Sequence, residues 1–266
     1  KCCLQFAVYL AIARVVCKKT TELAYTNLRF YMDSKIFTHV VTNVLLFVLV
    51  VGVAVTAFSG AYVSVFGDNN GSPIYRGKQT NAVSFMINVY WGTEYIDDML
   101  EILSKYNVKA TFFVGGYWVA KYPNVLCKIV ENGHEIGNHG YFHKQHSTLT
   151  LEQNKNEIIS CEKVVYETCG VVTKLFAPPS GDFGKLTLSA AESLGYKIIM
   201  WSKDTVDWRD KNAELIFSRA TKDAQGGDLI LMHPTRHTLH ALENMVKYYL
   251  EHGFDIVKVG DNLGGI

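Results

Sequence analysis

From about Asn81 onward, short apolar runs alternate with longer stretches in which apolar residues recur every three or four positions. The short runs are typical of buried strands, and the longer period is typical of amphipathic helices. Regular alternation over roughly 185 residues predicts a parallel α/β architecture, either an incomplete (β/α) barrel or a doubly wound sheet. The predicted strands are 82–89, 110–114, 135–138, 174–177, 197–201, 228–232 and 254–259.

The two clearest predicted helices are residues 95–106 and 151–168, each with apolar side chains along one face. Thr150 and Gln153 have the spacing of a capping box at the start of the second helix. Gly170 suits the left-handed residue that commonly follows a helix end. These signals bound the second helix at both ends.

The His, Asp, Trp, Pro and Gly residues that are candidates for function in this region follow predicted strands directly. They lie in the segments 139–143, 178–181 and 204–208 and at His233. In parallel α/β folds, functional side chains gather at the C-terminal ends of the strands. Four such loops therefore predict a single site.

The N-terminal part of the chain has a different pattern. Between Lys35 and Asp68 lie 32 residues without Asp, Glu, Lys or Arg. About 20 apolar residues at about 1.5 Å per residue cross a hydrocarbon layer, so residues 40–66 predict a transmembrane helix. A buried core helix and a cleaved signal sequence are the alternatives, the latter because residues 57–61 imitate a cleavage site.

Charge around this segment predicts its orientation. Six Lys and Arg precede it, against two Asp and Glu, which favours a cytoplasmic N-terminus with the remainder exported. The predicted organisation is a cytoplasmic segment (1–39), a signal-anchor helix (40–66), a linker (67–80) and an extracytoplasmic domain (81–266). Together these describe a single-pass protein of the cell membrane.

Composition narrows the function classes. With 26 Lys and Arg against 25 Asp and Glu, the chain offers no electrostatic reason to bind nucleic acid. Its six cysteines do not form a metal-type CxxC cluster. Cys161 and Cys169 would lie about 12 Å apart along one helix, too far for a bridge, whereas Cys127 could pair with either.

Histidines and carboxylates are the candidate chemical groups. His139 and His143 are four residues apart, a spacing that suits a divalent-metal clamp on one turn or tight loop. His134 and His146 nearby are interpreted as solvated or structural.

A second group follows the later strands. Asp204 and Asp207 form a carboxylate pair that could orient a histidine or accept a proton, although Asp in such a turn is also a common local cap. Trp208 beside them suits contact with a sugar or acyl group. His233 ends an apolar strand, where it would face the site and act as an acid near neutral pH.

In this order, the motifs resemble the polysaccharide deacetylases of the NodB-homology type, carbohydrate esterase family 4. The resemblance is closest to the membrane-anchored, sporulation-associated branch of endospore-forming Firmicutes. It covers about two thirds of the chain, and its segments are NVKATFFVGG (107–116), ENGHEIGNHGYFH (131–143), FAPPSGDF (176–183), WSKDTVDW (201–208) and GDLILMH (227–233).

The resemblance implies a deformed (β/α) barrel whose members remove acetyl groups from N-acetylated glycans such as peptidoglycan or chitin. It also implies a divalent ion, usually zinc, held by one Asp and two His. His139 and His143 match the two metal histidines, and His233 matches the general acid. Asp207 matches the carboxylate that tunes this acid, and Pro179 and Trp208 fall at substrate-contacting positions.

The first motif departs from the family pattern T-F-D-D-G. An ungapped match puts Met86 at the base position and Ile87 at the metal position, and Ala177 replaces an Arg that orients the base. Asn88, Asp182 or Asp204 could supply a substitute oxygen ligand.

Two main hypotheses follow. One is a metal-dependent deacetylase with a weakened or rewired centre. The other is a catalytically inactive glycan-binding or structural relative, favoured by the lost carboxylates and Arg. A third class is an intracellular membrane protein without a glycan role.

Overall fold

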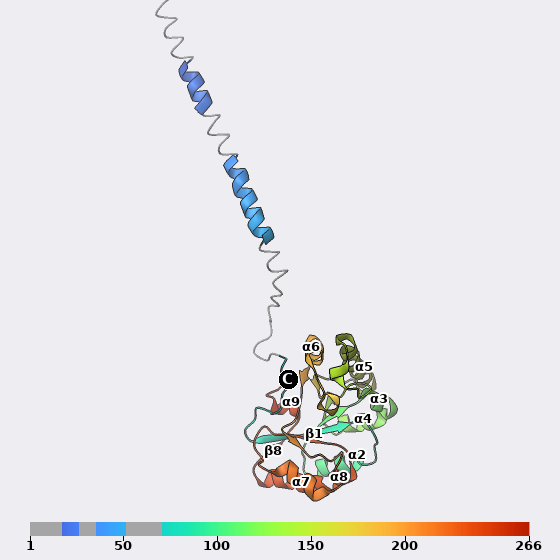
Figure 1. Cartoon of the computed structure of the whole chain (residues 1–266). Helices are drawn as coiled ribbons and strands as arrows, with labels where there is room; N and C mark the ends of the chain where they lie inside the picture. Colours follow the sequence, from blue (N-terminus) through green and yellow to red (C-terminus); the bar gives the residue numbers. More distant parts are fainter. Residues whose placement is uncertain (1–17, 27–35, 52–70, 266) are drawn as a thin grey trace, which may run out of the picture. The chain divides into compact units, whose positions relative to one another are not determined.

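The computed structural model describes residues 18–26, 36–51 and 71–265 (Figure 1). The chain divides into two compact units, Lys1–Gly67 and Asp68–Ile266. In the first unit, both described stretches are helical.

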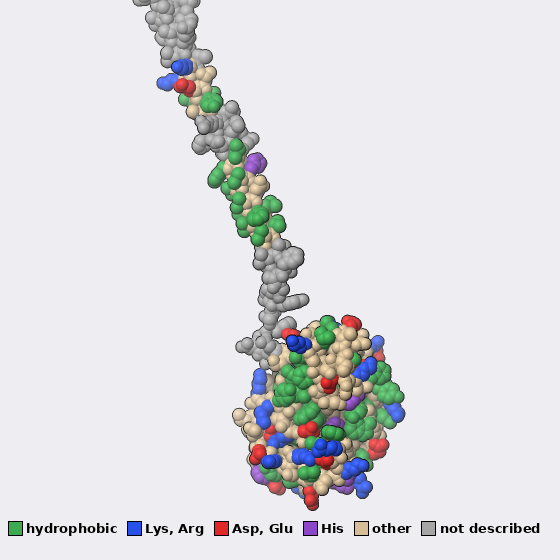
Figure 2. Space-filling view, viewed as in Figure 1, with side chains coloured by type: hydrophobic (Ala, Val, Ile, Leu, Met, Phe, Trp, Pro, Cys, Tyr) green, Lys and Arg blue, Asp and Glu red, His purple; other side chains and the backbone are tan. Residues whose placement is uncertain are grey.

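Residues 40–51 of the predicted membrane segment belong to the described helix at 36–51. Its Val, Leu and Phe side chains are exposed and appear in green in Figure 2. Among the described residues, no helix is both long and apolar enough to cross a membrane. Residues 52–66 of the predicted span lie outside the described residues, so the anchor stays a prediction.

The second unit alternates strands and helices along the chain (Figure 1). Its strands are β1 (Ala82–Val89), β2 (Thr111–Val114), β3 (Glu135–Asn138), β4 (Leu175–Phe176), β5 (Lys197–Ile198), β6 (Lys203–Asp204), β7 (Leu229–Met232) and β8 (Asp255–Ile256). Its helices are α2 (Ile96–Lys105), α3 (Gly116–Lys121), α4 (Pro123–Glu131), α5 (Leu151–Cys169), α6 (Lys185–Ser193), α7 (Ala213–Thr221), α8 (Arg236–Glu251) and α9 (Val259–Asn262), with 3-10 turns η1 (His146–Thr148) and η2 (Pro179–Gly181).

All seven predicted strands are present in the described region, and β1 and β3 have the predicted bounds. The others are shorter than predicted. Sequence reasoning missed β6, because a polar two-residue strand shows no periodicity. The capping box of Thr150 and Gln153 is confirmed, and Gly170 ends α5 with φ +70°.

The sheet is parallel throughout, in the order β5-β4-β3-β2-β1-β7-β6, with β8 paired to β1. Along this path β5 and β6 are the edges, so the sheet stays open. Register places Val89, Val114 and Asn138 side by side at the ends of β1, β2 and β3. The C-terminal ends of the central strands therefore meet at one level.

Strand β1 separates two apolar clusters, which is why its sequence is almost continuously hydrophobic. Val83, Phe85, Ile87 and Val89 pack in the cluster shared with α2, α4, α5 and α8. Met86 packs in a second cluster, on the inside of the sheet. That inner cluster combines residues from β1, β2, β4 and β7, which are not all neighbours in the sheet, so the sheet curls around it. The result is a half-barrel, which decides between the two predicted architectures.

The chain before β1 joins distant parts of this half-barrel. Ile74 forms a parallel bridge with Ile199, just after β5, and Arg76 forms an antiparallel bridge with Asp228, just before β7. Part of the segment predicted as a linker, from Ile74 onward, is therefore hydrogen-bonded to the barrel. We call residues 74–79 the seam segment.

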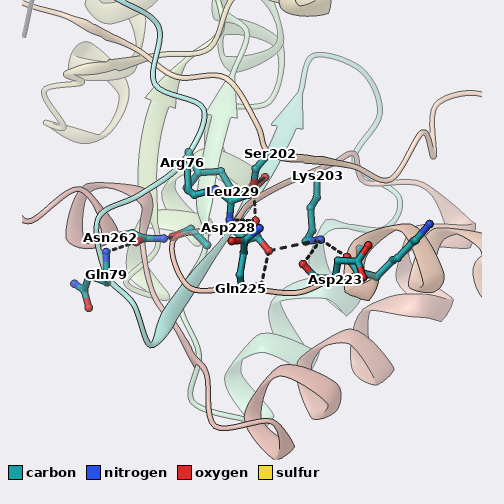
Figure 3. A network of polar contacts seen from close by, with 12 residues as sticks. Arg76, Gln79, Ser202, Lys203, Asp223, Gln225, Asp228, Leu229 and Asn262 are labelled. Carbon is teal, nitrogen blue, oxygen red and sulfur yellow. Dashed lines mark hydrogen bonds and ion pairs between the residues drawn. The ribbon is translucent and has the colours of Figure 1, made fainter.

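A buried carboxylate anchors the seam segment (Figure 3). Asp228 is fully buried and accepts hydrogen bonds from Arg76 Nη1 at 2.6 Å and Ser202 Oγ at 2.7 Å. The backbone N–H of Gln225 donates to it at 2.9 Å, and Lys203 Nζ lies 3.6 Å away. A buried charge is tolerated when it is paired and hydrogen-bonded in this way.

Candidate functional site

A cavity of about 320 Å³ opens at the C-terminal ends of the strands. The residues around it come from the ends of β1, β3, β6 and β7 and from the loops after β4 and β5. They are Asn88, Tyr90, His139, His143, Ser180, Gly181, Trp201, Asp204, Trp208, Leu231 and His233. The cavity thus brings together the four loops that the sequence predicted to form one site.

The two predicted metal histidines lie in the loop after β3. His139 is 1% exposed, and its Nδ1 lies 2.7 Å from the carbonyl oxygen of Ala177. That contact makes Nδ1 the protonated nitrogen and leaves the lone pair on Nε2. The rings of His139 and His143 are 5.1 Å apart. Ala177, at the family's Arg position, therefore acts through its backbone.

Burial keeps both rings neutral. It lowers the pKa of His139 well below its usual value, and it lowers the pKa of His143 to about 4. Neutral imidazoles at pH 7 offer a lone pair to a metal ion or to a hydrogen-bond donor.

Glu157 of α5 holds this loop, and sequence reasoning missed it. Its Oε2 accepts the backbone N–H groups of Tyr141 and Phe142 at 2.9 and 2.7 Å, and Lys144 lies 3.0 Å from Oε1. Two donated N–H groups fix the path of the chain between the two histidines. The signal was a Glu on the buried side of a predicted helix.

We call the side of the cavity formed by His233, the predicted acid, and Asp207 the acid side. Its polar groups are hydrogen-bonded to one another. Asp207 accepts hydrogen bonds from the His233 backbone N–H at 2.6 Å, from His233 Nδ1 at 2.7 Å and from Thr238 Oγ1 at 2.5 Å. The carboxylate fixes the His233 tautomer with Nδ1 protonated. Nε2 can then accept a proton when the ring is neutral and donate one when the ring is charged. Thr238, at the start of α8, is a positioning residue that the sequence did not reveal.

The two predicted substrate-contacting residues, Trp208 and Pro179, differ in whether they are exposed and line the cavity. Trp208 is 59% exposed and lines the cavity. Pro179 is buried, and the described cavity lining from its turn consists of Ser180 and Gly181 instead. Substrate contact by Pro179 stays a prediction, and in this structure the two residues after it line the cavity.

The end of β1 corrects the reading of the first motif. Met86 and Ile87 are fully buried within the strand, in the inner and outer clusters, and neither lines the cavity. The β1 residues that reach the cavity are Asn88 and, just beyond the strand, Tyr90. The ungapped match therefore placed both motif positions inside the strand, although the predicted bounds of the strand were correct.

At the end of β1, aromatic rings lie over His143 and over His233. The Tyr90 ring stacks on His143 with centroids 3.5 Å apart, and the Trp91 ring stacks on His233 at 5.4 Å. The two aromatic rings also touch edge to face at 4.3 Å. Burial raises the pKa of Tyr90, so its hydroxyl stays protonated at neutral pH. Sequence reasoning missed Tyr90, although its position directly after a strand was a signal.

The residues present do not fit the family's Asp-His-His metal set. Among the described residues, no three His, Cys, Asp or Glu side chains gather as a metal group. Asp182 accepts the Ser147 N–H at 2.8 Å and is not among the residues that line the cavity. Asp204 lines the cavity, and its Oδ1 accepts the Val206 N–H at 2.8 Å. Asn88 also lines the cavity, is 3% exposed, and its buried Oδ1 has no hydrogen-bond partner.

The histidines interpreted as structural lie outside the cavity lining described. His134 Nδ1 accepts the backbone N–H of Ala110 at 3.1 Å, and burial lowers its pKa to about 4. His146 is fully buried, with its Nδ1 2.7 Å from Asn154 Oδ1. Both serve the packing around β3.

Comparison with known proteins points to one family. Residues 76–199 match the polysaccharide deacetylase family. The chain is 39% identical over 183 residues to the uncharacterized protein YlxY of Bacillus subtilis (strain 168), covering 68% of this chain and 57% of YlxY. It is 30% identical over 175 residues to a peptidoglycan-N-acetylglucosamine deacetylase of Bacillus cereus, covering 64% of this chain and 82% of that protein.

A solved structure supports the same family. The crystal structure of BA3943, a CE4 family pseudoenzyme from Bacillus anthracis, superposes with a TM-score of 0.72 at 34% identity, covering 74% of this chain and 70% of that one. The chain spans little more than half the length of YlxY.

Proposed function

Because this chain belongs to the polysaccharide deacetylase family, we propose that its cavity binds N-acetylated cell-envelope polysaccharide, a peptidoglycan or chitin-like glycan, without metal-assisted hydrolysis. Peptidoglycan deacetylases are hydrolases of carbon–nitrogen bonds other than peptide bonds. The observation that carries the proposal is the end of β1, where Asn88 and the Tyr90 ring line the cavity and this strand contributes no carboxylate.

Aromatic rings suit sugar binding because their faces pack against the apolar C–H faces of a pyranose while their polar edges stay hydrated. Tyr90 and Trp91 are each 37% exposed, and Trp208 is 59% exposed. The unpaired Oδ1 of Asn88 is an acceptor that an N–H donor such as an acetamido group could satisfy. These groups support recognition of the glycan.

The test is equilibrium binding of the 266-residue chain to N-acetylglucosamine oligomers, with and without a chelator, together with an acetate assay. We expect saturable binding that the chelator leaves unchanged, and no acetate release. Absence of binding would overturn the proposal, as would acetate release that the chelator abolishes. Tyr117→Ala is a matched control, because Tyr117 is 58% exposed and lies outside the cavity lining.

Hydrolysis is the second candidate, and the intact pairing of His233 with Asp207 is the observation that favours it. In that case His233 would protonate the leaving amine while Asp207 holds its tautomer. Metal stoichiometry after Zn²⁺ loading and dialysis separates the candidates. Near one ion per chain, lost in the His139→Ala, His143→Ala double variant, would support a deacetylase, and no retained ion would support binding alone.

We also propose that residues 40–66 tether the protein to the cell membrane with the barrel outside the cytoplasm. The charge-free stretch and the positive segment before it support this orientation. Protease added to intact cells should then degrade the barrel. Full protection in intact cells, with degradation after lysis, would place it inside. A role in sporulation stays a prediction from the family resemblance.

A further inference from the structure

Three cysteines in the described region carry free thiols: Cys127 on α4, and Cys161 and Cys169 on α5. The sequence left Cys127 able to pair with either of the others. Cys161 is fully buried, and its Sγ lies 3.2 Å from the carbonyl oxygen of Val114. Burial also raises the pKa of the Cys161 thiol to about 12, so it stays protonated and out of reach of an oxidant.

Cys127 and Cys169 have the opposite environment. Both are partly exposed, and they belong to helices that pack together. The Cys127 Sγ lies 3.7 Å from the carbonyl oxygen of Thr168, the residue directly before Cys169. Across a trans peptide this oxygen is about 2.8 Å from the next Cα, so the Cys127 Sγ is at most about 6.5 Å from the Cys169 Cα.

This proximity suits a covalent bond. In a disulfide the two sulfurs are about 2.05 Å apart, so each sulfur lies within about 5 Å of the Cα of the other cysteine. The upper bound here is about 1.5 Å longer, a difference that side-chain rotation at both cysteines can close. Burial raises the pKa of the Cys169 thiol, and the neighbouring Cys127 contributes in the same direction. The first thiol to react is therefore expected to be Cys127.

We propose that Cys127 and Cys169 form an intramolecular disulfide when the protein meets an external disulfide such as oxidised glutathione. The Cys127 thiolate attacks the external disulfide and releases one reduced glutathione. The Cys169 thiolate then attacks the mixed disulfide, forms the Cys127–Cys169 bond and releases the second glutathione. Two protein thiols lose two electrons and two protons, and one glutathione disulfide becomes two thiols.

The bond would close a loop around the predicted metal histidines. Residues 127–169 contain β3, His139 and His143, and they end in α5, whose Glu157 holds the loop between those histidines. A cross-link over this span restricts the unfolded chain and stabilises the fold. The pair is thus a modification site, independent of glycan binding.

Peptide mapping of the full chain tests the proposal. Native protein is incubated with oxidised glutathione, quenched in acid, alkylated and digested with trypsin. The three cysteines fall on separate tryptic peptides, 122–128, 156–163 and 164–174. We expect peptide 122–128 linked to 164–174, with their summed mass less two hydrogens, and peptide 156–163 unlinked.

Matched variants complete the test. Cys169→Ser should abolish the linked peptide, whereas Cys161→Ser should keep it. Oxidised wild-type protein should melt at least about 5 °C above its reduced form, and Cys127→Ser should show no such difference. Recovery of 122–128 and 164–174 as separate peptides, or a link from either to 156–163, would overturn the proposal.

Discussion

The two sides of the cavity differ in how far they are built into the fold. On the acid side, Asp207 accepts three hydrogen bonds and joins His233 to α8 through Thr238. On the β1 side, Asn88 leaves its Oδ1 unpaired, and Tyr90 and Trp91 lie over the histidines while remaining partly exposed. The acid side therefore contributes to the stability of the fold, whereas the β1 side is expected to tolerate substitution without loss of the barrel.

Removing Asp207 should have the largest effect. Asp207→Ala leaves the His233 ring, its backbone N–H and the Thr238 hydroxyl without their partner, so we expect a loss of about 3 to 5 kcal/mol in the free energy of unfolding. Asn88→Leu, on the other side, should change it by about 1 kcal/mol or less, because the lost acceptor is already unpaired. Urea titration measures both, and equal losses would contradict the comparison.

Restoring a carboxylate on the β1 side comes next. Asn88→Asp places an anionic oxygen in the cavity with two neutral imidazoles, the donor types that zinc prefers. We expect Zn²⁺ affinity to rise at least about 100-fold, which is about 2.7 kcal/mol. Calorimetry measures it, with His139→Ala added to the variant as the control. Unchanged affinity would show that the Tyr90 ring, not the missing charge, prevents metal binding.

Acid should weaken the fold through histidines that are buried neutral. The pKa of His134 is about 4 in the fold and about 6.5 when unfolded, so its contribution is complete above pH 6.5 and lost as the pH falls toward 4. The loss is about 2 to 3 kcal/mol. His143, with a pKa of about 4, acts in the same window. Melting from pH 7 to 4.5 should therefore be less pH-dependent in His134→Gln, and an identical slope would contradict this.

Removing the aromatic ring of Tyr90 should have the smallest effect. Tyr90→Ala should lower affinity for N-acetylglucosamine oligomers about 5- to 10-fold, or about 1 kcal/mol, because a stacking surface is lost. Its stability should stay close to wild type. Calorimetric titration measures it beside Tyr117→Ala, which should bind normally. Tighter binding after removal of Tyr90 would show that the ring blocks the cavity.

The sequence was informative where local rules decide the structure. The strand and helix pattern, the capping box and Gly170 depend on nearby residues, and the four loops follow from parallel topology. The first motif was misplaced because the match was made without gaps, which put its two carboxylate positions at Met86 and Ile87, inside β1. Two faces of a buried strand are both apolar, so no alternation revealed which residues point inward.

Other parts of the site depend on contacts between distant segments. Glu157 reaches the loop before α5, and Thr238 reaches a carboxylate 31 residues earlier. Tyr90 covers His143 only because β1 and β3 end at the same level. Such partners have no fixed spacing in the chain, so a single sequence does not identify them.

The seam segment also determines how much of the chain before β1 must be kept when the barrel is moved into a fusion protein. A truncation beginning at Asn81, the predicted domain start, would delete Arg76 and leave Asp228 buried without its closest cation. It would also delete Ile74, which bridges to the residue after β5. Transplanting this barrel onto a fusion partner therefore requires a junction upstream of Ile74.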